Sequence, residues 1–513
     1  MNTSFTTLYR VWGEGSEEIA FRISRMGYVA LQNTVLEEPH WQRLPRWRGF
    51  NLLNKYQCGY HRPFDESEFQ IISDWGFNYA RLPLDYRCWI KNGDWTRFEE
   101  SELAEIDKAI EYGRKHAVHV TLNFHRAPGY CVNNPPEKKD LWRDPDALDI
   151  CAMYWANFAR RYRGIPNTDL SFNLINEPHK ISESTYVSVV ERLATAIREH
   201  DPGRLIIVDG LEWGMTPLPH LKRLQVAQST RGYTPSNLSL FRSPWMEGGD
   251  VMPIPSWPVQ PHVGGYLYGP CHPDVRAPLV ITGDFPPGTR LQLDVHKVSQ
   301  RCVLELHADS QRVWREYLES GPGEGPWKRV VFDPTYHKYQ NIFDRMYEAT
   351  LPQRASRIAL RVTEGDWLSF TQIVIERPGK KPISIQPSTR EWGVKHAMVA
   401  IDESDIQRFF STTPTLNRER LLTHTFAPWL RTAKAEVGVM VGEWGCFNKT
   451  PHAVFLKWAE DSLSLWKECG WGWALWNLVG SFGVLNSERA DVLYQDFRGY
   501  KLDRALLRLL QKY

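Results

Sequence analysis

Residues 170–179 read LSFNLINEPH, an apolar run that ends abruptly in Asn176, Glu177 and Pro178. A short apolar run bounded in this way is typical of a strand that is buried on both faces, as in a parallel sheet. A lone glutamate just past a strand is usually a solvated surface charge. Glu177 therefore indicates a functional site only if other predicted strands also end in polar or charged residues.

Seven further segments have the same apolar character, and longer amphipathic segments separate most of them. The predicted strands are 47–53, 77–84, 118–124, 170–176, 204–210, 224–230, 437–443 and 471–478. The predicted helices cover 103–116, 145 to before Gly164, about 184–200, 451 to before Gly470, and about 501–512. Eight strands alternating with helices favour a (β/α)8 barrel. An open doubly wound sheet is the alternative, but the phosphate-binding pattern GxGxxG that often marks it is absent.

Residues 240–389 break this alternation. A stretch rich in Pro, Gly and aromatic residues is followed by runs of period two, such as TRLQLDVHKV at 289–298 and SRIALRVTEG at 356–365. These runs predict an antiparallel β-sandwich inserted between barrel strands 6 and 7. The predicted domains are a barrel of residues 1–239 and 390–513, and a sandwich of residues 240–389.

Composition narrows the classes of function. The chain has 513 residues with 62 basic and 60 acidic side chains, so its net charge of +2 gives no case for nucleic acid or membrane partners. The 22 Trp residues are unusually many, and their flat faces serve cores or stack on sugar rings. The eight Cys form no CxxC pair, which predicts free thiols and no zinc site. With no signal peptide visible, we expect a cytoplasmic protein, unless a leader has been removed.

A second glutamate ends a strand in the same manner. Glu443 closes the apolar run VGVMVGEWG, residues 437–445. In a barrel, the carboxyl ends of all strands meet at one face, so Glu177 and Glu443 are predicted to face each other across the mouth. Two carboxyl groups about 5–5.5 Å apart are the machinery of a retaining glycosidase. One protonates the leaving oxygen, and the other attacks the anomeric carbon.

These motifs resemble glycoside hydrolase family 5, the cellulase and mannanase family of retaining (β/α)8 enzymes. The family's strand-4 motif Asn-Glu-Pro is matched by residues 176–178, which implies that Glu177 is the acid/base and that Asn176 holds the sugar 2-hydroxyl. The strand-7 glutamate, the nucleophile in that family, is matched by Glu443. The resemblance covers residues 47–237 and 392–513, which is nearly the whole predicted barrel.

The resemblance also implies four substrate-binding residues. Arg81, in ARLPL, matches the strand-2 arginine that supports the nucleophile, and His125, in NFHRAPGY, matches the strand-3 histidine beside the attacked sugar. Trp476 fits the strand-8 sugar platform. The family's His-x-Tyr after strand 6 is matched only in part, by Arg231 and Tyr233, so the tyrosine role carries over while Arg231 leaves leaving-group or substrate specificity open.

Other residues are weaker candidates. Acids near predicted strand ends have a smaller chance of touching substrate: Asp85, Asp209, Glu212, Glu488 and Asp491. Tryptophans that are either sugar platforms or packing residues are Trp47, Trp213, Trp444 and Trp473. Cys446 has no partner motif and is expected to be inert. In the sandwich, which resembles a carbohydrate-binding module, Trp314, Trp327 and Trp367 either stack on sugars or fill the core.

The resulting hypothesis is a retaining β-glycosidase for β-linked gluco- or manno-oligosaccharides or polysaccharides, working without a cofactor or metal. Its partner is then the carbohydrate substrate. Insertion of the sandwich at the catalytic face favours exo action or a preference for oligosaccharides. The alternatives are an endo-acting cellulase or mannanase, and a barrel that only binds carbohydrate. A serine hydrolase is poorly supported, because no GxSxG elbow is present. The sugar, the linkage and the oligomeric state stay open.

Overall fold

Eight parallel strands form a closed barrel in the computed structural model, which describes residues 38–246, 254–259, 263–410 and 416–513. The sheet runs β2-β1-β21-β20-β9-β8-β7-β5, and pairing of β2 with β5 closes it. All eight predicted strands are confirmed. Their bounds are β1 Arg48–Asn51, β2 Tyr79–Asp85, β5 His119–Ala127, β7 Leu170–Ile175, β8 Ile206–Asp209, β9 Ala227–Gly232, β20 Val439–Trp444 and β21 Gly472–Leu475. Residues 1–37, which the predicted barrel domain includes, lie outside the described residues.

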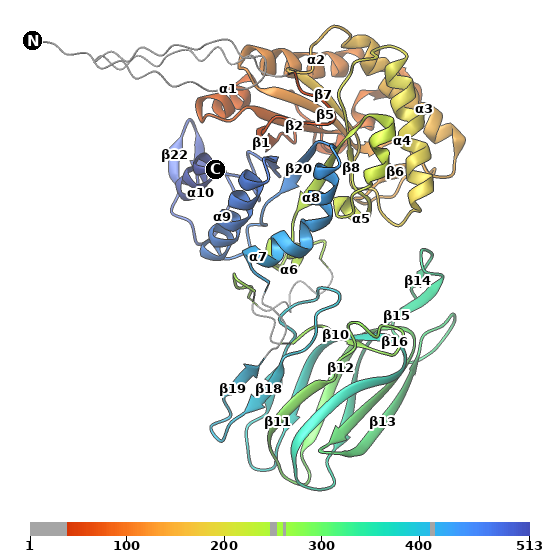
Figure 1. The fold of residues 1–513 in the computed structure, drawn as a ribbon, viewed down its shortest axis with the longest axis vertical. Helices are drawn as coiled ribbons and strands as arrows, with labels where there is room; N and C mark the ends of the chain where they lie inside the picture. Colours follow the sequence, from red (N-terminus) through yellow and green to blue (C-terminus); the bar gives the residue numbers. More distant parts are fainter. Residues whose placement is uncertain (1–37, 247–253, 260–262, 411–415) are drawn as a thin grey trace, which may run out of the picture. The chain divides into compact units, whose positions relative to one another are not determined.

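Helices cover the outside of this barrel, and α3 and α4 pack against each other there (Figure 1). Asp144 precedes α3 and Pro145 is its first residue, as predicted. The prediction missed α1 and α8. None of the helices in the described ranges combines the length and apolar character needed to cross a bilayer. The helices of at least two turns are α1 Glu66–Asp74, α2 Glu100–Lys115, α3 Pro145–Arg161, α4 Glu183–Arg198, α8 Ala427–Lys434, α9 His452–Glu468 and α10 Arg504–Lys512.

Shorter elements decorate the ends of the barrel strands. Two small hairpins, β3–β4 and β22–β23, form separate sheets, and β6 extends the barrel sheet beside β5. Their bounds are β3 Ile90–Lys91, β4 Asp94–Phe98, β6 Tyr130–Cys131, β22 Gln495–Phe497 and β23 Tyr500–Leu502, with one-turn helices α5 Leu211–Gly214, α6 Ser236–Ser239 and α7 Arg418–Arg420.

The barrel strands are apolar because both of their faces are buried. Every residue of β7 is buried, as is every residue of β2, β5 and β20. Burying one large aliphatic side chain contributes about 1.5–3 kcal/mol, so these strands supply much of the driving force for folding. Close approach also matters at Gly49 in β1, where a Cβ atom would lie 1.7 Å from the carbonyl oxygen of Tyr79.

Aromatic rings fill the end of the barrel where the strands begin. Trp47, just before β1, stacks on His119 with ring centroids 3.8 Å apart and on Tyr79 at 5.5 Å. Burial lowers the pKa of His119 to about 3, so its ring stays neutral within this cluster. Trp47 therefore packs at the end of the barrel opposite the strand carboxyl ends, so the structure supports packing, one of the two roles predicted for it.

A β-sandwich follows β9 and precedes β20, as predicted. It has its own hydrophobic core, and the residues described between 263 and 410 contain no helix. Two long strands, β12 and β16, pair along nearly their whole length in antiparallel register, whereas β11 and β18 pair in parallel. The strands are β10 Tyr266–Tyr268, β11 Leu279–Phe285, β12 Arg290–Ala308, β13 Gln311–Glu319, β14 Phe332–Asp333, β15 Lys338–Thr350, β16 Ala355–Glu376, β17 Ile383–Ile385, β18 Met398–Ile401 and β19 Gln407–Phe410.

The end of the sandwich differs from the predicted boundary. Strands β18 and β19 continue the sandwich sheet beyond β11, so this sheet extends to residue 410 rather than ending at 389. The four-residue runs of these strands are too short for a clear period-two pattern, which explains why the sequence did not reveal them.

Candidate active site

Glu177 lies at the carboxyl end of β7 in an unusual backbone conformation. Its φ angle is 48°, in the left-handed region, which costs a residue with a side chain about 1–2 kcal/mol. The backbone N–H of Glu177 donates a hydrogen bond of 2.9 Å to Oδ2 of Asp209, the last residue of the neighbouring strand β8. The buried carboxylate thus fixes the turn that carries Glu177 at the barrel mouth.

Glu443 lies near the end of β20 and is only 3% exposed. Arg81 of β2 donates from Nη1 to Oε1 of Glu443 at 2.6 Å, as predicted for a residue that supports this carboxylate. The guanidinium is itself held by Asn51 at 2.9 Å, Asn173 at 3.0 Å and Asn176 at 2.8 Å. Three amide oxygens therefore orient Arg81, and Arg81 orients Glu443.

Arg231 of β9 bridges the two glutamates. Its Nε donates to Oε1 of Glu177 at 2.8 Å, and its Nη2 lies 3.2 Å from Oε1 of Glu443. Nη2 also donates to Asn176 at 2.8 Å and to Asp209. Burial disfavours the charged guanidinium, but the charges of Asp209, Glu443 and Glu177 outweigh this and raise the pKa of Arg231. One fully buried cation therefore joins both carboxylates, so Glu177 and Glu443 lie close together.

The environment of Glu177 raises its pKa to about 8. Burial of the carboxyl group is the largest cause, and the like charge of Glu443 is the next. Arg231 acts in the opposite direction, without cancelling these effects. The side chain retains 15% exposure, so it can still meet a ligand at the mouth. A carboxyl group that stays protonated near neutral pH can serve as a general acid.

Three aromatic rings gather beside the carboxylates. His125, at the end of β5, lies 4.6 Å from Tyr56 and 5.5 Å from Trp476, measured between ring centroids. Nε2 of His125 lies 3.0 Å from Nδ2 of Asn133 and therefore accepts a hydrogen bond. Burial and the neighbouring arginines hold the pKa of His125 well below its ordinary value, so the ring is neutral. Half-buried Trp476 presents a ring edge-on to Tyr56, which suits a sugar platform.

Tyr233 approaches the same site from the segment after β9. Its hydroxyl donates to Oε2 of Glu443 over 3.4 Å, a long hydrogen bond. Burial and the charge of Glu443 raise the pKa of Tyr233 well above its ordinary value, so the phenol keeps its proton. The structure thus brings together all seven residues predicted for the site: Arg81, His125, Asn176, Glu177, Tyr233, Glu443 and Trp476.

Of the weaker acidic candidates, the structure brings Asp209 into the site. Asp85 is buried and pairs with Arg87 at 2.6 Å, where it fixes the loop after β2. Asp491 accepts the backbone N–H of His452 at the start of α9. These two carboxylates serve local structure. Glu488 is exposed and Glu212 is half-buried, and neither has a hydrogen bond to the catalytic pair among the described residues.

The weaker tryptophan candidates divide clearly. Trp444 and Trp473 are fully buried in the core of the barrel, so they are not sugar platforms. Trp213 is 42% exposed and stacks on His179 with centroids 4.5 Å apart. Since His179 follows Glu177 by two residues, Trp213 is a second candidate platform near the acid/base. Cys446 is fully buried, and burial raises the pKa of its thiol, in agreement with an inert role.

Sequence reasoning missed Asn51 and Tyr56. Asn51 is a polar residue at the end of β1, so the reasoning that identified Glu177 at the end of a buried strand could have found it. Tyr56 lies in a loop, where no such pattern is present. Sequence reasoning also missed a cluster in which ligand atoms of Cys58, His61 and Cys88 lie within 4.8 Å of one another. Burial raises the pKa of both thiols, which disfavours the thiolates that a metal ion would need.

Comparison with known proteins shows what the first part of the barrel resembles. Residues 41–239 match the model of the family "Cellulase (glycosyl hydrolase family 5)". Endoglucanase C of Acetivibrio thermocellus is 27% identical over 169 residues, which is 32% of this chain and 49% of that protein. Cellodextrinase A of Ruminococcus flavefaciens is 29% identical over 136 residues, 25% of this chain and 40% of that protein. The chain thus spans about half the length of the curated relatives it matches, or less.

A solved structure extends the likeness to most of the chain. A crystal structure described as a glycoside hydrolase has 26% sequence identity and a TM-score of 0.58, and the match covers 91% of this chain and 99% of that one. The family match includes Glu177 and ends before Glu443, whose assignment therefore rests on the geometry above. The first part of the barrel, residues 41–239, is thus similar to the cellulase family, glycosyl hydrolase family 5.

Proposed function

We propose that this chain is a retaining β-glycoside hydrolase in which Glu177 is the acid/base and Glu443 the nucleophile. The observation that carries the proposal is the bridge of Arg231 between the two carboxylates, of which one has a pKa of about 8. The acid must carry a proton and the nucleophile must be ionised, so the two roles require neighbouring carboxyl groups with different protonation states. The family match adds the precedent of glycosyl hydrolysis for the barrel.

The first step uses each carboxyl group once. Protonated Glu177 gives its proton to the glycosidic oxygen while Glu443 attacks the anomeric carbon, so the bond to the leaving sugar breaks and a glycosyl ester forms. In the second step, ionised Glu177 takes a proton from water. That water attacks the same carbon, which releases the sugar and restores both carboxyl groups. Acid–base and covalent catalysis by these side chains suffices for the cycle.

The hydrogen bonds select one oxygen of Glu443 for attack. Oε1 accepts from Arg81 at 2.6 Å and lies 3.2 Å from Arg231, whereas among the described residues Oε2 has only the 3.4 Å bond from Tyr233. The less strongly bound oxygen keeps more of its nucleophilicity, so Oε2 is the attacking atom. Tyr233 then steadies that oxygen while its negative charge is lost to the new bond.

Asn176 is suited to hold a substrate hydroxyl. Its Oδ1 accepts from both Arg81 and Arg231 at 2.8 Å, which fixes the amide orientation. Its Nδ2 is buried and has no partner among the described residues. A buried donor without a partner is costly, and a sugar hydroxyl would satisfy it. This agrees with the role for Asn176 that the family resemblance implies.

β-linked gluco- or manno-oligosaccharides are the proposed substrates. The relatives named endoglucanase and cellodextrinase favour the gluco series, and the latter name favours short chains. The sandwich leaves the barrel after β9, at the end of the strands where the carboxylates lie. An insertion at this end favours exo action or a preference for oligosaccharides over mid-chain cutting. Endo action, which the name endoglucanase favours, is the second candidate.

Hydrolysis of aryl β-glucosides, β-cellobiosides and β-mannosides, followed by proton NMR of the first product anomer, tests this proposal. We expect the β-anomer to form first, and Glu177→Gln to slow hydrolysis of substrates with poor leaving groups by at least about a hundredfold. Glu111→Gln, on the exposed surface of α2, is the matched control and should hydrolyse normally. Initial release of the α-anomer would refute the retaining mechanism, and binding without turnover of any substrate would favour a barrel that only binds.

Endo and exo action are separated by a second experiment. Products from cellohexaose and mannohexaose are followed in time, together with the viscosity of a soluble β-glucan and a β-mannan. Early release of mono- or disaccharides with little loss of viscosity is expected. A rapid fall in viscosity would establish endo action instead.

A further inference from the structure

The sandwich tryptophans predicted either to stack on sugars or to fill the core mostly pack inside the sandwich. Trp367 is only 8% exposed, and Trp314 and Trp327 are partly buried against the sandwich core. The exposed aromatic residues of the sandwich include Trp392 at 51% exposure and Tyr336 at 66%. Both line the same hollow, so the candidate sugar-binding surface of the sandwich lies here.

Trp392 is held in one orientation by its neighbours. Its ring meets Tyr266, Tyr268 and Trp367 edge-on, with centroids 5.4, 4.8 and 5.6 Å apart. The next residue, Gly393, donates its backbone N–H to the hydroxyl of Tyr268 at 2.6 Å. The indole is therefore a rigid exposed surface, and little conformational entropy would be lost when a ligand stacks on it.

A polar cluster lies at the same hollow. Asp366 is nearly buried and accepts hydrogen bonds from Ser299 at 2.7 Å, Lys338 at 3.0 Å and His272 at 2.5 Å. Burial acts to raise the pKa of Asp366, but these hydrogen bonds outweigh it and lower the pKa. The side chains of Lys338 and His272 are 37% and 26% exposed, so they are fixed and still within reach of a ligand.

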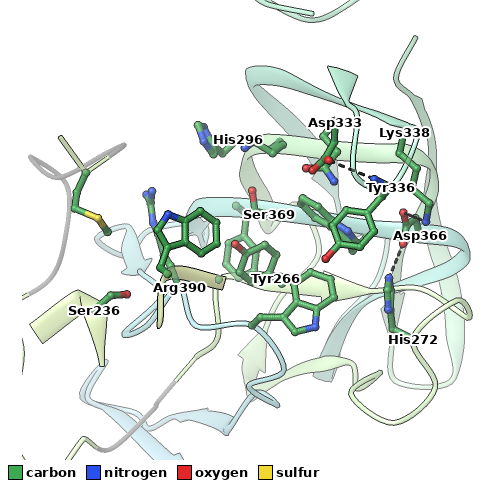
Figure 2. A pocket seen from close by; sticks show the side chains of 18 residues that line it. Ser236, Tyr266, His272, His296, Asp333, Tyr336, Lys338, Asp366, Ser369 and Arg390 are labelled. Atoms are coloured by element: carbon green, nitrogen blue, oxygen red, sulfur yellow. Dashed lines mark hydrogen bonds and ion pairs between the residues drawn. The ribbon is translucent and has the colours of Figure 1, made fainter. Parts of the chain in front are cut away.

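Figure 2 shows how these groups share one space. Tyr266 and Tyr336 point into the hollow, and Asp366 lies between Lys338 and His272 at its side. Tyr266 comes from β10 and Asp366 from β16, two strands paired in register. Asp333 caps the turn that carries Tyr336 by accepting its backbone N–H. Rigid rings and fixed polar groups thus converge from separate parts of the sandwich.

Three basic side chains of the hollow are paired with carboxylates, and Lys297 and Arg390 line it as well. Lys338 and His272 are already paired with Asp366, and His296 lies 2.6 Å from Asp344. Flat aromatic faces beside fixed hydrogen-bonding groups suit a pyranose ring, whose apolar face stacks while its hydroxyl groups bond to the polar side chains.

We propose that this hollow, lined by Tyr266, Tyr336, Trp367, Trp392, Lys338 and Asp366, is a second saccharide-binding site. Its ligand is a neutral β-linked chain of glucosyl or mannosyl units, a class that rests on the function proposed for the barrel. The site holds the chain by stacking on Trp392 and Tyr336 and by hydrogen bonds to the Asp366 cluster. It carries out no chemistry.

Calorimetric titration of the full chain tests the site. Glu443→Gln is used as the background so that cellohexaose and mannohexaose are not consumed. We expect two binding events with at least one of these probes, and Trp392→Ala should weaken one of them by at least about tenfold while the other persists. Tyr317→Ala removes another exposed aromatic ring of the sandwich and should leave both events in place.

Further outcomes decide against the proposal. A single binding event, or two events that Trp392→Ala leaves unchanged, would overturn it, and so would binding abolished by 0.5 M NaCl, because a neutral ligand is not held by unscreened charge. If Trp392→Ala fails to fold, Tyr336→Ala replaces it, since that ring is more exposed. Failure of the barrel function appears separately, as absence of turnover by the unmodified chain.

Discussion

Replacement of Glu443 by glutamine should lower the pKa of Glu177, because the like charge of Glu443 helps to raise that pKa to about 8. Two carboxylates about 5.5 Å apart, the separation typical of a retaining pair, repel each other by about 3 kcal/mol at an effective dielectric constant of about 20. Removal of this repulsion lowers the pKa of Glu177 by about two pH units. The same change accompanies formation of the glycosyl ester, which prepares Glu177 to act as a base.

Carbon-13 NMR of protein labelled at the glutamate carboxyl carbons measures this pKa directly. Glu177→Gln identifies the signal, and Glu443→Asp is the matched control because it keeps the charge and should leave the pKa near its original value. In the unmodified enzyme, the basic limb of kcat/KM should fall near pH 8. A pKa of Glu177 that does not fall in Glu443→Gln would refute the coupling. A pKa near 4.5 in the unmodified protein would refute the acid role.

Three further predictions follow from single positions. The folded-state pKa of Glu177, about 8, exceeds the ordinary value of 4.5, so the protein loses stability as pH rises from about 4.5 to 8. Glu177→Gln should therefore raise Tm most above pH 8 and little below pH 4.5. A lower Tm of this variant at pH 8 would contradict the expectation. Tyr233→Phe removes one long hydrogen bond and should lower kcat about 2–10-fold in steady-state assays, whereas a loss above about a hundredfold would contradict a supporting role. Gly49→Ala would place Cβ 1.7 Å from the carbonyl oxygen of Tyr79 and should lower the free energy of unfolding by at least about 3 kcal/mol in denaturant titration. Gly59→Ala, with open space around it, serves as the control. A Gly49→Ala variant of normal stability would refute the close packing of β1 on β2.

Much of the barrel could be predicted because burial on both faces leaves a direct mark on sequence. Most barrel strands contain an apolar run, although β9 reads AQSTRG, and the predicted helices have a periodic face or a helix-start signal such as Asp144 before Pro145. The same rule fails for β18 and β19, whose four residues leave no readable period. The barrel strands β1, β8 and β21 are equally short, but the regular alternation of strands and helices marks them, and β18 and β19 have no such context.

The candidate site was predictable to the extent that its residues follow strands. Glu177 and Glu443 were found because a carboxylate after a buried strand is unusual, and family resemblance supplied the roles of the others. The bridge formed by Arg231 was not foreseeable, because it depends on how far one side chain reaches across the barrel. Trp392 was missed for a similar reason: its exposure is set by the rings that pack around it.

Mass spectrometry after incubation with activated 2-deoxy-2-fluoro glycosides tests the central claim most directly. The fluorine slows both steps by destabilising positive charge at the anomeric carbon, and the good leaving group restores only the first, so the glycosyl ester accumulates. With a gluco or manno reagent, we expect a stable adduct of one sugar, which peptide mapping places on Glu443. An adduct on another residue, or none with either reagent in a protein that hydrolyses the matching aryl glycoside, would contradict the account.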